Sequence, residues 1–268
     1  MVNARVLVTG ANGFLGGHVE EELRHSFTLV TTSRRGGDHA VDLRDRAGRQ
    51  AMLAAARPDF VLHLAAASRM AACEADPDGA RRDNVEVPSE LAEEFGARLL
   101  LVSTDLVFDG RCAPYGALDP VSPLSVYGVT KAEGEERVVA RGGRVVRLPL
   151  LFGPDGQGRG ASAMIRSAIA QRRPVSLFAN EYRTPLHCHD AARALAALLP
   201  RTDLPRLLHV AGPERVSRWE FGRRLCAALA LPTEFLHAAE CQDPLRPRDV
   251  SLKSDFVQRS LAEMLADC

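Results

Sequence analysis

The chain has 268 residues, of which 46% are hydrophobic and 25% are charged, and its formal net charge is +0. This length suits one large α/β domain, or one domain with a smaller lobe. The balanced charge and an aromatic content of 5% argue against a nucleic-acid binder and against a protein that docks on an anionic membrane.

In the first 150 residues, short apolar segments alternate with helical patterns. We expect strands at residues 6–8, 27–32, 60–64, 98–102 and 144–148. We expect helices at residues 14–24, 46–57, 78–96 and 125–140, the third of which must accommodate Pro88. This alternation predicts an α/β fold with a doubly wound parallel sheet, the Rossmann fold.

After Pro149 the pattern changes to a Gly-rich loop at 153–160 followed by mixed elements. We expect a helix at 161–171, a strand at 175–178, a helix at 190–199, a strand at 207–210, a helix at 217–229 and then an irregular Pro-containing tail. The predicted domains are a dinucleotide-binding domain of residues 1–150 plus parts of 180–212, and a smaller substrate lobe formed mainly by 151–268.

Other sequence features bear on the compartment and on metals. No run of about 18 apolar residues predicts a membrane span, and no signal-peptide pattern is seen at the N-terminus. We therefore expect a cytoplasmic protein with six reduced cysteines. His187-Cys188-His189 resembles a metal-binding sequence, but adjacent residues on a strand face opposite sides, so no metal is predicted.

A glycine-rich loop follows the first strand and opens the first helix. Gly10, Gly13 and Gly16 allow a sharp turn and a close backbone approach to a pyrophosphate, with Asn12, Phe14 and Leu15 beside them. The helix N-terminus offers free N–H groups to an anion. The loop predicts a dinucleotide site.

The second strand leads into the residues that would select the nicotinamide cofactor. An acidic residue there would bind the ribose of NAD, but the chain has Ser33-Arg34-Arg35. Arginine suits a 2′-phosphate, so NADP(H) is favoured and NAD(H) stays open; a solvated turn is the alternative. We also expect Asp42 and Leu43 near the adenine, and Leu64, Ala65 and Ala66 near the ribose.

Three residues suggest carbonyl reduction. Thr104 ends the fourth strand, and Tyr127 and Lys131 are four residues apart on one helix face. Hydride transfer to a carbonyl requires a proton, which Tyr127 would supply. We expect Lys131 to lower the pKa of Tyr127 and to hold the nicotinamide ribose, and Thr104 to stabilise the oxyanion. Alternatively, Tyr127 is a core residue and Lys131 a solvated charge.

These motifs resemble the extended short-chain dehydrogenases/reductases, and in particular the dTDP-4-dehydrorhamnose reductase branch. The resemblance rests on the Gly loop, the catalytic residues and several further segments: Ser103-Thr104-Asp105-Leu106-Val107-Phe108-Asp109-Gly110, Pro123, Gly128, Gly134-Glu135, Arg183-Thr184-Pro185, Arg246-Pro247 and Leu252. It implies reduction of a 4-keto nucleotide sugar, a C-terminal lobe that holds this substrate, and a homodimer as a family-level expectation.

Two positions depart from that branch. Leu106 stands where the branch usually has Tyr, and Leu150 where it commonly has an aromatic residue. With Ser103, Asp105 and Arg183, they are the expected substrate-binding residues; Arg183 either pairs with a diphosphate or forms a surface ion pair. Asn84 is expected to brace the fourth strand.

Three alternatives remain open. One is a non-catalytic NADP-binding subunit similar to the regulatory β subunit of methionine adenosyltransferase. Another is a reductase or epimerase acting on a different carbonyl in secondary metabolism. A dehydratase is disfavoured, because Leu106 occupies the position where a dehydratase commonly has Glu.

Overall fold

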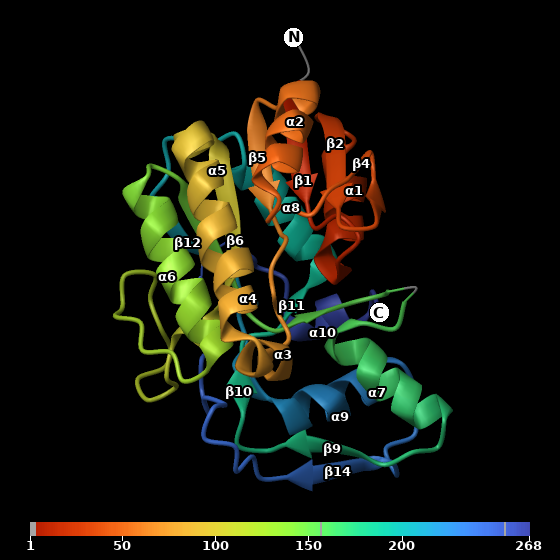
Figure 1. Cartoon of the computed structure of the whole chain (residues 1–268). Coiled ribbons are helices and arrows are strands. Elements are labelled where there is room, and N and C mark those ends of the chain that lie inside the picture. Colours follow the sequence, from red (N-terminus) through yellow and green to blue (C-terminus); the bar gives the residue numbers. More distant parts are fainter. Residues whose placement is uncertain (1–3, 156, 255) are drawn as a thin grey trace.

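A seven-stranded parallel sheet forms the centre of the computed structural model, which describes residues 4–155, 157–254 and 256–268 (Figure 1). The strands in spatial order are β12 (Leu207–His209), β7 (Arg144–Leu148), β6 (Leu99–Thr104), β5 (Phe60–His63), β1 (Arg5–Thr9), β2 (Thr28–Ser33) and β4 (His39–Ala40). Every neighbouring pair is parallel. The predicted α/β fold with its doubly wound sheet is confirmed.

The order of the strands reverses between β1 and β5. From β1 the chain builds outward through β2 to β4, and then returns to start the other half with β5. The carboxyl ends of β1 and β5 therefore flank a topological switch point, which is where open α/β sheets bind ligands.

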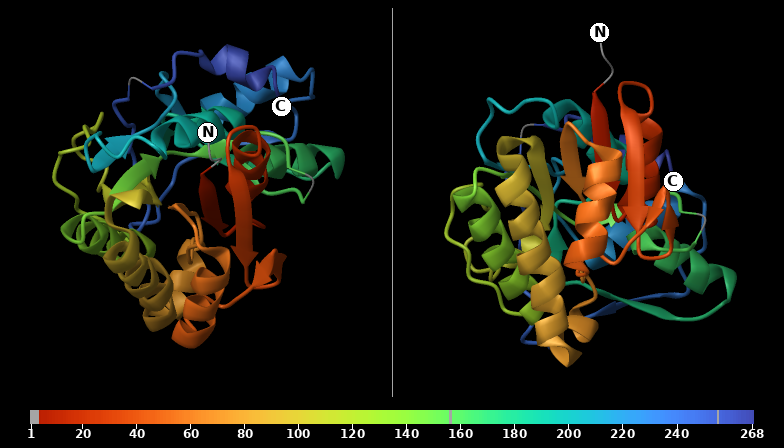
Figure 2. Two further views of the ribbon diagram at one scale, coloured as in Figure 1. Left: turned by 90° about the horizontal axis from the view of Figure 1, so that it is seen from above. Right: turned by 45° about the horizontal axis from the view of Figure 1, so that its top comes forward.

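Helices cover both faces of the sheet (Figure 2). Alternating residues of β1 face opposite sides, so Val6 and Val8 pack in one core and Leu7 packs in the other. The first core contains α1 (Phe14–Leu23) and α8 (Cys188–Leu198), and the second contains α2 (Arg46–Ala56), α5 (Val87–Phe95) and α6 (Val126–Ala140).

The predicted helix at 78–96 is divided in the structure. It consists of α4 (Pro77–Arg81), the π-helical turn η1 (Arg82–Glu86) and α5, and Pro88 lies in the first turn of α5. Proline is tolerated there because the first helical N–H groups need no intrahelical acceptor. A short helix, α3 (Met70–Ala75), was not predicted.

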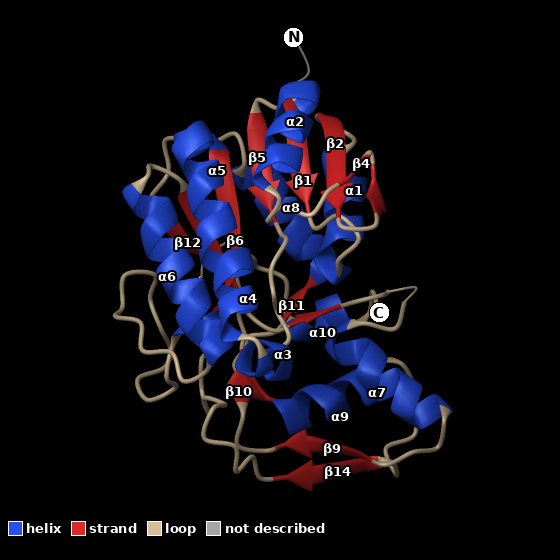
Figure 3. Cartoon of the chain, viewed as in Figure 1, coloured by secondary structure: helices blue, strands red, loops and turns tan. Residues whose placement is uncertain are grey.

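A smaller lobe lies beyond the carboxyl ends of the strands, with β9 and β14 along its outer side (Figure 3). Its elements are α7 (Gly160–Ala170), β9 (Val175–Phe178), β10 (Tyr182–Arg183), β13 (Val216–Ser217), α9 (Arg218–Ala228) and β14 (Leu236–Ala239). β9 pairs with β14, and β10 with β13. Because β12 returns to the main sheet, we propose the division into residues 1–150 plus parts of 180–212, and mainly 151–268.

The tail is more ordered than the sequence suggested. It contributes β14 and α10 (Leu261–Leu265), which has a capping box between Ser260 and Glu263. The remaining short elements are β3 (Gly36–Gly37), β8 (Leu151–Phe152), β11 (Leu186–His187) and the 3₁₀ turns η2 (Gly96–Arg98) and η3 (Asp105–Val107). All six cysteines are free thiols. Within the described ranges, no helix combines the length and the apolar character needed to cross a membrane.

Candidate active site

The glycine-rich loop makes the turn that its sequence predicts. Gly10 has a φ of +71°, and a Cβ at this position would lie 2.7 Å from the backbone nitrogen of Ala65. Only glycine combines that conformation with so close an approach to the loop after β5. Gly13 is the N-cap of α1 without a side-chain cap, and the first turn has no acidic residue. The first N–H groups of α1 are therefore available to an anion.

A cavity of about 680 Å³ opens beside this loop. All predicted cofactor residues except Lys131 line it: Gly10, Asn12, Gly13, Phe14, Leu15, Gly16, Ser33, Arg34, Arg35, Asp42, Leu43, Leu64, Ala65 and Ala66. Further lining residues were missed: Thr32, Val41, His63, Ser68, Asp83 and Val87. Thr32 is the second-last residue of β2 and His63 is the last residue of β5. Both adjoin predicted residues, a signal that could have revealed them.

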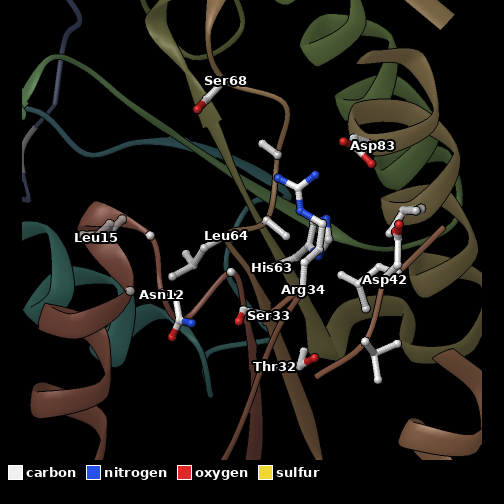
Figure 4. A pocket seen from close by; sticks show the side chains of 18 of the residues that line it. Asn12, Leu15, Thr32, Ser33, Arg34, Asp42, His63, Leu64, Ser68 and Asp83 are labelled. Carbon is white, nitrogen blue, oxygen red and sulfur yellow. The ribbon is translucent and has the colours of Figure 1, made fainter. Parts of the chain in front are cut away.

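Arg34 is an exposed cation on the wall of this cavity, and its guanidinium extends into the space toward Asp83 (Figure 4). Asp42 is already engaged, because Arg44 donates to it at 2.6 Å and holds its carboxyl pKa down at about 2. No ion pair of Arg34 is found among the described residues. Its guanidinium is available to a phosphate.

His63 faces the cavity from the end of β5. Its Nδ1 lies 2.8 Å from the Thr9 hydroxyl, while its buried Nε2 has no hydrogen-bond partner among the described residues. Burial, reinforced by Lys131, lowers the pKa of His63 to about 3, so the ring is neutral at physiological pH. An unsatisfied ring nitrogen in the wall of this cavity is consistent with a polar ligand.

Thr104 ends β6 with its side chain buried. Its hydroxyl donates to Asp105 Oδ1 at 3.1 Å and accepts from the backbone N–H of Leu106 at 3.2 Å. The same hydroxyl acts on the Tyr127 phenol and lowers its pKa. The strand end thus fixes a hydroxyl between a carboxylate and a phenol.

Tyr127 lies in the first turn of α6, which Ser125 caps by accepting from Gly128 N. Burial, together with Asp105 and other nearby acidic groups, raises the pKa of Tyr127 well above its ordinary value, although the Thr104 hydrogen bond opposes this. The expected net lowering of this pKa is therefore not found. The physical reason is that burial strongly disfavours the charged phenolate.

Lys131 is almost completely buried, with 2% of its surface exposed. Its Nζ donates to the carbonyl oxygen of Val102 in β6 at 2.8 Å. Burial lowers the pKa of Lys131 to about 8, against a raising effect of Glu135. The alternative in which Lys131 is a solvated charge is excluded, and α6 brings Lys131 and Tyr127 to the carboxyl half of β6.

Two glycines hold α6 close to its neighbours. A Cβ at Gly128 would collide with the carbonyl oxygen of Leu106, and a Cβ at Gly134 would collide with that of Asn84. Asn84 itself bonds the backbone of Ala67 and the hydroxyl of Thr130. It therefore braces α6 and the loop after β5 rather than β6, which corrects the prediction.

Four of the predicted substrate residues lie around the end of β6, and the fifth, Leu150, follows β7. Arg183 is 5% exposed; its Nε lies 3.4 Å from Asp105 Oδ2 and its Nη2 3.5 Å from Glu181 Oε1, so the surface-pair alternative is wrong. Burial raises the pKa of Asp105 to about 6, against the lowering effect of Arg183. Ser103 Oγ is buried with no hydrogen bond among the described residues, Leu106 packs beside Phe108, and Leu150 packs against the main core.

Comparisons with known proteins agree with this architecture. The RmlD substrate binding domain family matches residues 4–265. Methionine adenosyltransferase 2 subunit beta of Pongo abelii is 30% identical over 274 residues, covering 93% of this chain and 80% of that protein. The probable low-salt glycan biosynthesis reductase of Haloferax volcanii is 28% identical over 256 residues, covering 90% and 85%.

Solved structures share the fold. A dTDP-4-dehydrorhamnose reductase of Bacillus anthracis in complex with NADP gives a TM-score of 0.89 at 21% identity, covering 99% of this chain and 98% of that one. A dTDP-4-dehydrorhamnose reductase of Clostridium acetobutylicum gives 0.86 at 23%, covering 98% and 97%. With the family match over nearly the whole chain, these findings show that the protein belongs to the RmlD substrate binding domain family, within the extended short-chain dehydrogenases/reductases.

Proposed function

We propose that the protein is an NAD(P)H-dependent ketoreductase that reduces the 4-keto group of a nucleotide-linked deoxysugar. The observation that carries this proposal is the constellation at the carboxyl end of β6. There, the Thr104 hydroxyl acts on the Tyr127 phenol and lowers its pKa, and Lys131 donates to the carbonyl of Val102, two residues before Thr104. A hydroxyl, a phenol and an ammonium held by one strand and one helix are the groups that carbonyl reduction requires.

The cavity residues fit a nicotinamide dinucleotide. The free N–H groups of α1 would receive the pyrophosphate, and Arg34 would bind a 2′-phosphate, which favours NADP(H) over NAD(H). Asp42 and Leu43 would lie beside the adenine, and Lys131 would hold the nicotinamide ribose. When bound, the reduced nicotinamide supplies a hydride to the substrate carbonyl carbon.

Tyr127 would supply the proton that the substrate oxygen needs. Because burial raises its pKa, the phenol is protonated at neutral pH, the state that a proton donor must have before a reduction. Thr104 would hold the substrate oxygen by donating its hydroxyl proton, after releasing its contact with Asp105. The buried Lys131 ammonium would stabilise the phenolate left after proton transfer.

The names of the relatives and the buried charges support the proposed substrate class. Reductases named for dTDP-4-dehydrorhamnose share the fold, and a relative is named a glycan biosynthesis reductase. Arg183 would position the substrate at the end of β6, where Asp105 orients its guanidinium. Leu106 and Leu150 are aliphatic and would give a sugar preference different from that of relatives with aromatic residues at these positions.

The test is turnover with purified protein. NADPH consumption is followed by absorbance with a 4-keto-6-deoxy nucleotide sugar generated in place by a dehydratase, for wild type and for Tyr127→Phe. We expect turnover in the wild type and a loss of at least about 100-fold in Tyr127→Phe. Tyr182→Phe is the matched control, because Tyr182 stacks under Arg215 at 3.6 Å and its phenol makes no hydrogen bond among the described residues.

A second candidate is a non-catalytic NADP-binding subunit, favoured by the 30% identity to methionine adenosyltransferase 2 subunit beta. In that case NADPH fluorescence would saturate with protein concentration, while no 4-keto nucleotide sugar would be turned over. Binding without turnover, unchanged by Tyr127→Phe, would overturn the reductase proposal.

A further inference from the structure

We propose that His18, Cys188 and His189 form a binding site for a Zn²⁺-class transition-metal ion. One ligand atom from each side chain lies within 4.8 Å of the other two. Typical Zn–S and Zn–N bonds of about 2.3 and 2.0 Å place tetrahedral ligands roughly 3.5 Å apart, so small side-chain rotations would close the site.

The site joins two helices that are distant in the sequence. His18 lies on α1, and Cys188 and His189 form the first turn of α8, directly after β11. The sequence reading placed 187–189 on a strand, where adjacent side chains would diverge. The chain instead changes from strand to helix at Cys188, so Cys188 and His189 can face the same helix, α1.

The donor set suits a borderline-soft ion. A thiolate and two imidazoles are ligands that favour zinc over magnesium or calcium. Cys188 is fully buried, whereas His18 and His189 are partly exposed, which leaves a path for the ion from solvent. Binding would release the Cys188 proton to solvent, and water would occupy the fourth position.

The surroundings of His18 resemble the outer shell of a metal site. Its Nε2 lies 3.0 Å from the carbonyl oxygen of Pro154, which can only accept, so this nitrogen carries the proton in a neutral ring. Nδ1 then keeps the lone pair that a metal needs. Metal-binding histidines commonly donate their second ring N–H to such a carbonyl.

The two neighbouring histidines have different roles. His187 Nδ1 accepts from the backbone N–H of His189 at 3.3 Å, so the ring is engaged by the backbone and is not counted as a ligand. The His189 ring contacts the rings of His18 and His187 but has no hydrogen bond among the described residues. His189 is thus a partly exposed imidazole that packs against the His18 ring near the buried Cys188 thiol. A metal ion shared by the three side chains explains this arrangement.

An ion at this site would link α1 to α8. Through the contact of His18 with Pro154, it would also link α1 to the loop before α7. None of the three ligands lines the dinucleotide cavity or belongs to the catalytic constellation. The proposal is therefore independent of the reductase function, and its readouts are metal content and stability.

The experiment uses the tag-free full chain, stripped with a chelator and dialysed against Zn²⁺ or Co²⁺. We expect about one equivalent of bound zinc, an absorption band from thiolate-to-cobalt charge transfer, and a Tm increase of about 5 °C at saturating zinc. Cys188→Ser and His189→Ala should each lose the cobalt band and at least about tenfold in zinc affinity.

Cys226→Ser is the matched control, because Cys226 is equally buried but lies on α9. This variant should retain the zinc stoichiometry and the cobalt band. Zinc binding that persists unchanged in Cys188→Ser, or less than about a tenth of an equivalent in the wild type, would overturn the proposal. If Cys188→Ser folds poorly, His18→Gln gives the same readout without altering the buried thiol.

Discussion

The Lys131 ammonium donates a hydrogen bond to the backbone of β6, with Nζ 2.8 Å from the carbonyl oxygen of Val102. The helix α6 is thereby tied to the strand that carries Thr104. One buried bond thus sets the distance between the two elements that supply the proposed catalytic groups.

Lys131→Met should remove activity while preserving the fold. Methionine has a similar volume, and Glu135 stays paired with Arg147 at 2.6 Å, so no unpaired buried charge is left. We expect kcat for the proposed reduction to fall by at least about 100-fold, with Tm nearly unchanged. Steady-state kinetics and thermal unfolding measure both; a variant that retains more than a tenth of the wild-type kcat would refute the assigned role.

Asp105 should make the stability of the protein depend on pH between about 4 and 6. Its folded pKa is raised from 3.8 to about 6, so its stabilising contribution is present below pH 3.8 and is lost as the pH rises through 6. Relative to Asp105→Asn, the wild type should lose up to about 3 kcal/mol of unfolding free energy over this range. Urea unfolding of both proteins at several pH values tests this, and parallel curves would contradict it.

Gly10→Ala should damage both stability and cofactor binding. The backbone has a φ of +71°, and the new methyl group would press on the nitrogen of Ala65. We expect a loss of at least about 1 kcal/mol in unfolding free energy and about tenfold in NADPH affinity.

The matched control is Gly17→Ala in α1, the helix that follows the glycine-rich loop. A Cβ at Gly17 would meet no atom within 4 Å. Helix propensity predicts a gain of about 0.5–1 kcal/mol. If the two substitutions had equal effects, the close approach at Gly10 would not be the cause.

Arg34→Ala should weaken the binding of NADPH but not that of NADH. Loss of the guanidinium removes a partner for the 2′-phosphate, so the Kd for NADPH should rise by about tenfold while that for NADH stays unchanged. Fluorescence titration of both cofactors gives the comparison. Arg24→Ala, which removes an exposed arginine paired with Glu20 on α1, controls for the general loss of positive charge. An equal loss for both cofactors would contradict 2′-phosphate recognition.

The sequence was sufficient to predict those elements whose own residues carry the signal for a strand or a helix. The predicted strands at 144–148 and 175–178 coincide with β7 and β9, because short segments of valine and leucine that follow turn residues carry their own signal. β14 was missed because Leu236–Ala239 has little strand character alone and is held by pairing with β9. The π-helical turn before Pro88 likewise depends on packing against α6.

In the candidate site, too, local features could be predicted from the sequence, whereas contacts between distant segments could not. The glycine loop and the Tyr127–Lys131 spacing are local, so their residues could be named from the sequence. The pKa of Tyr127 depends on burial and neighbouring acids, and the pairing of Arg183 with Asp105 joins segments far apart in the chain. His18 meets Cys188 only because α1 packs against α8.

The two glycine contacts of α6 have a consequence for engineering this protein. Because Gly128 touches the carbonyl of Leu106 and Gly134 touches that of Asn84, any side chain at either position would move α6 as a unit. Libraries that aim to change the substrate should therefore vary positions 106 and 150 and leave 128 and 134 constant. A scaffold that fixes the helix of the proposed catalytic groups at two points allows specificity to be redesigned while those groups keep their positions.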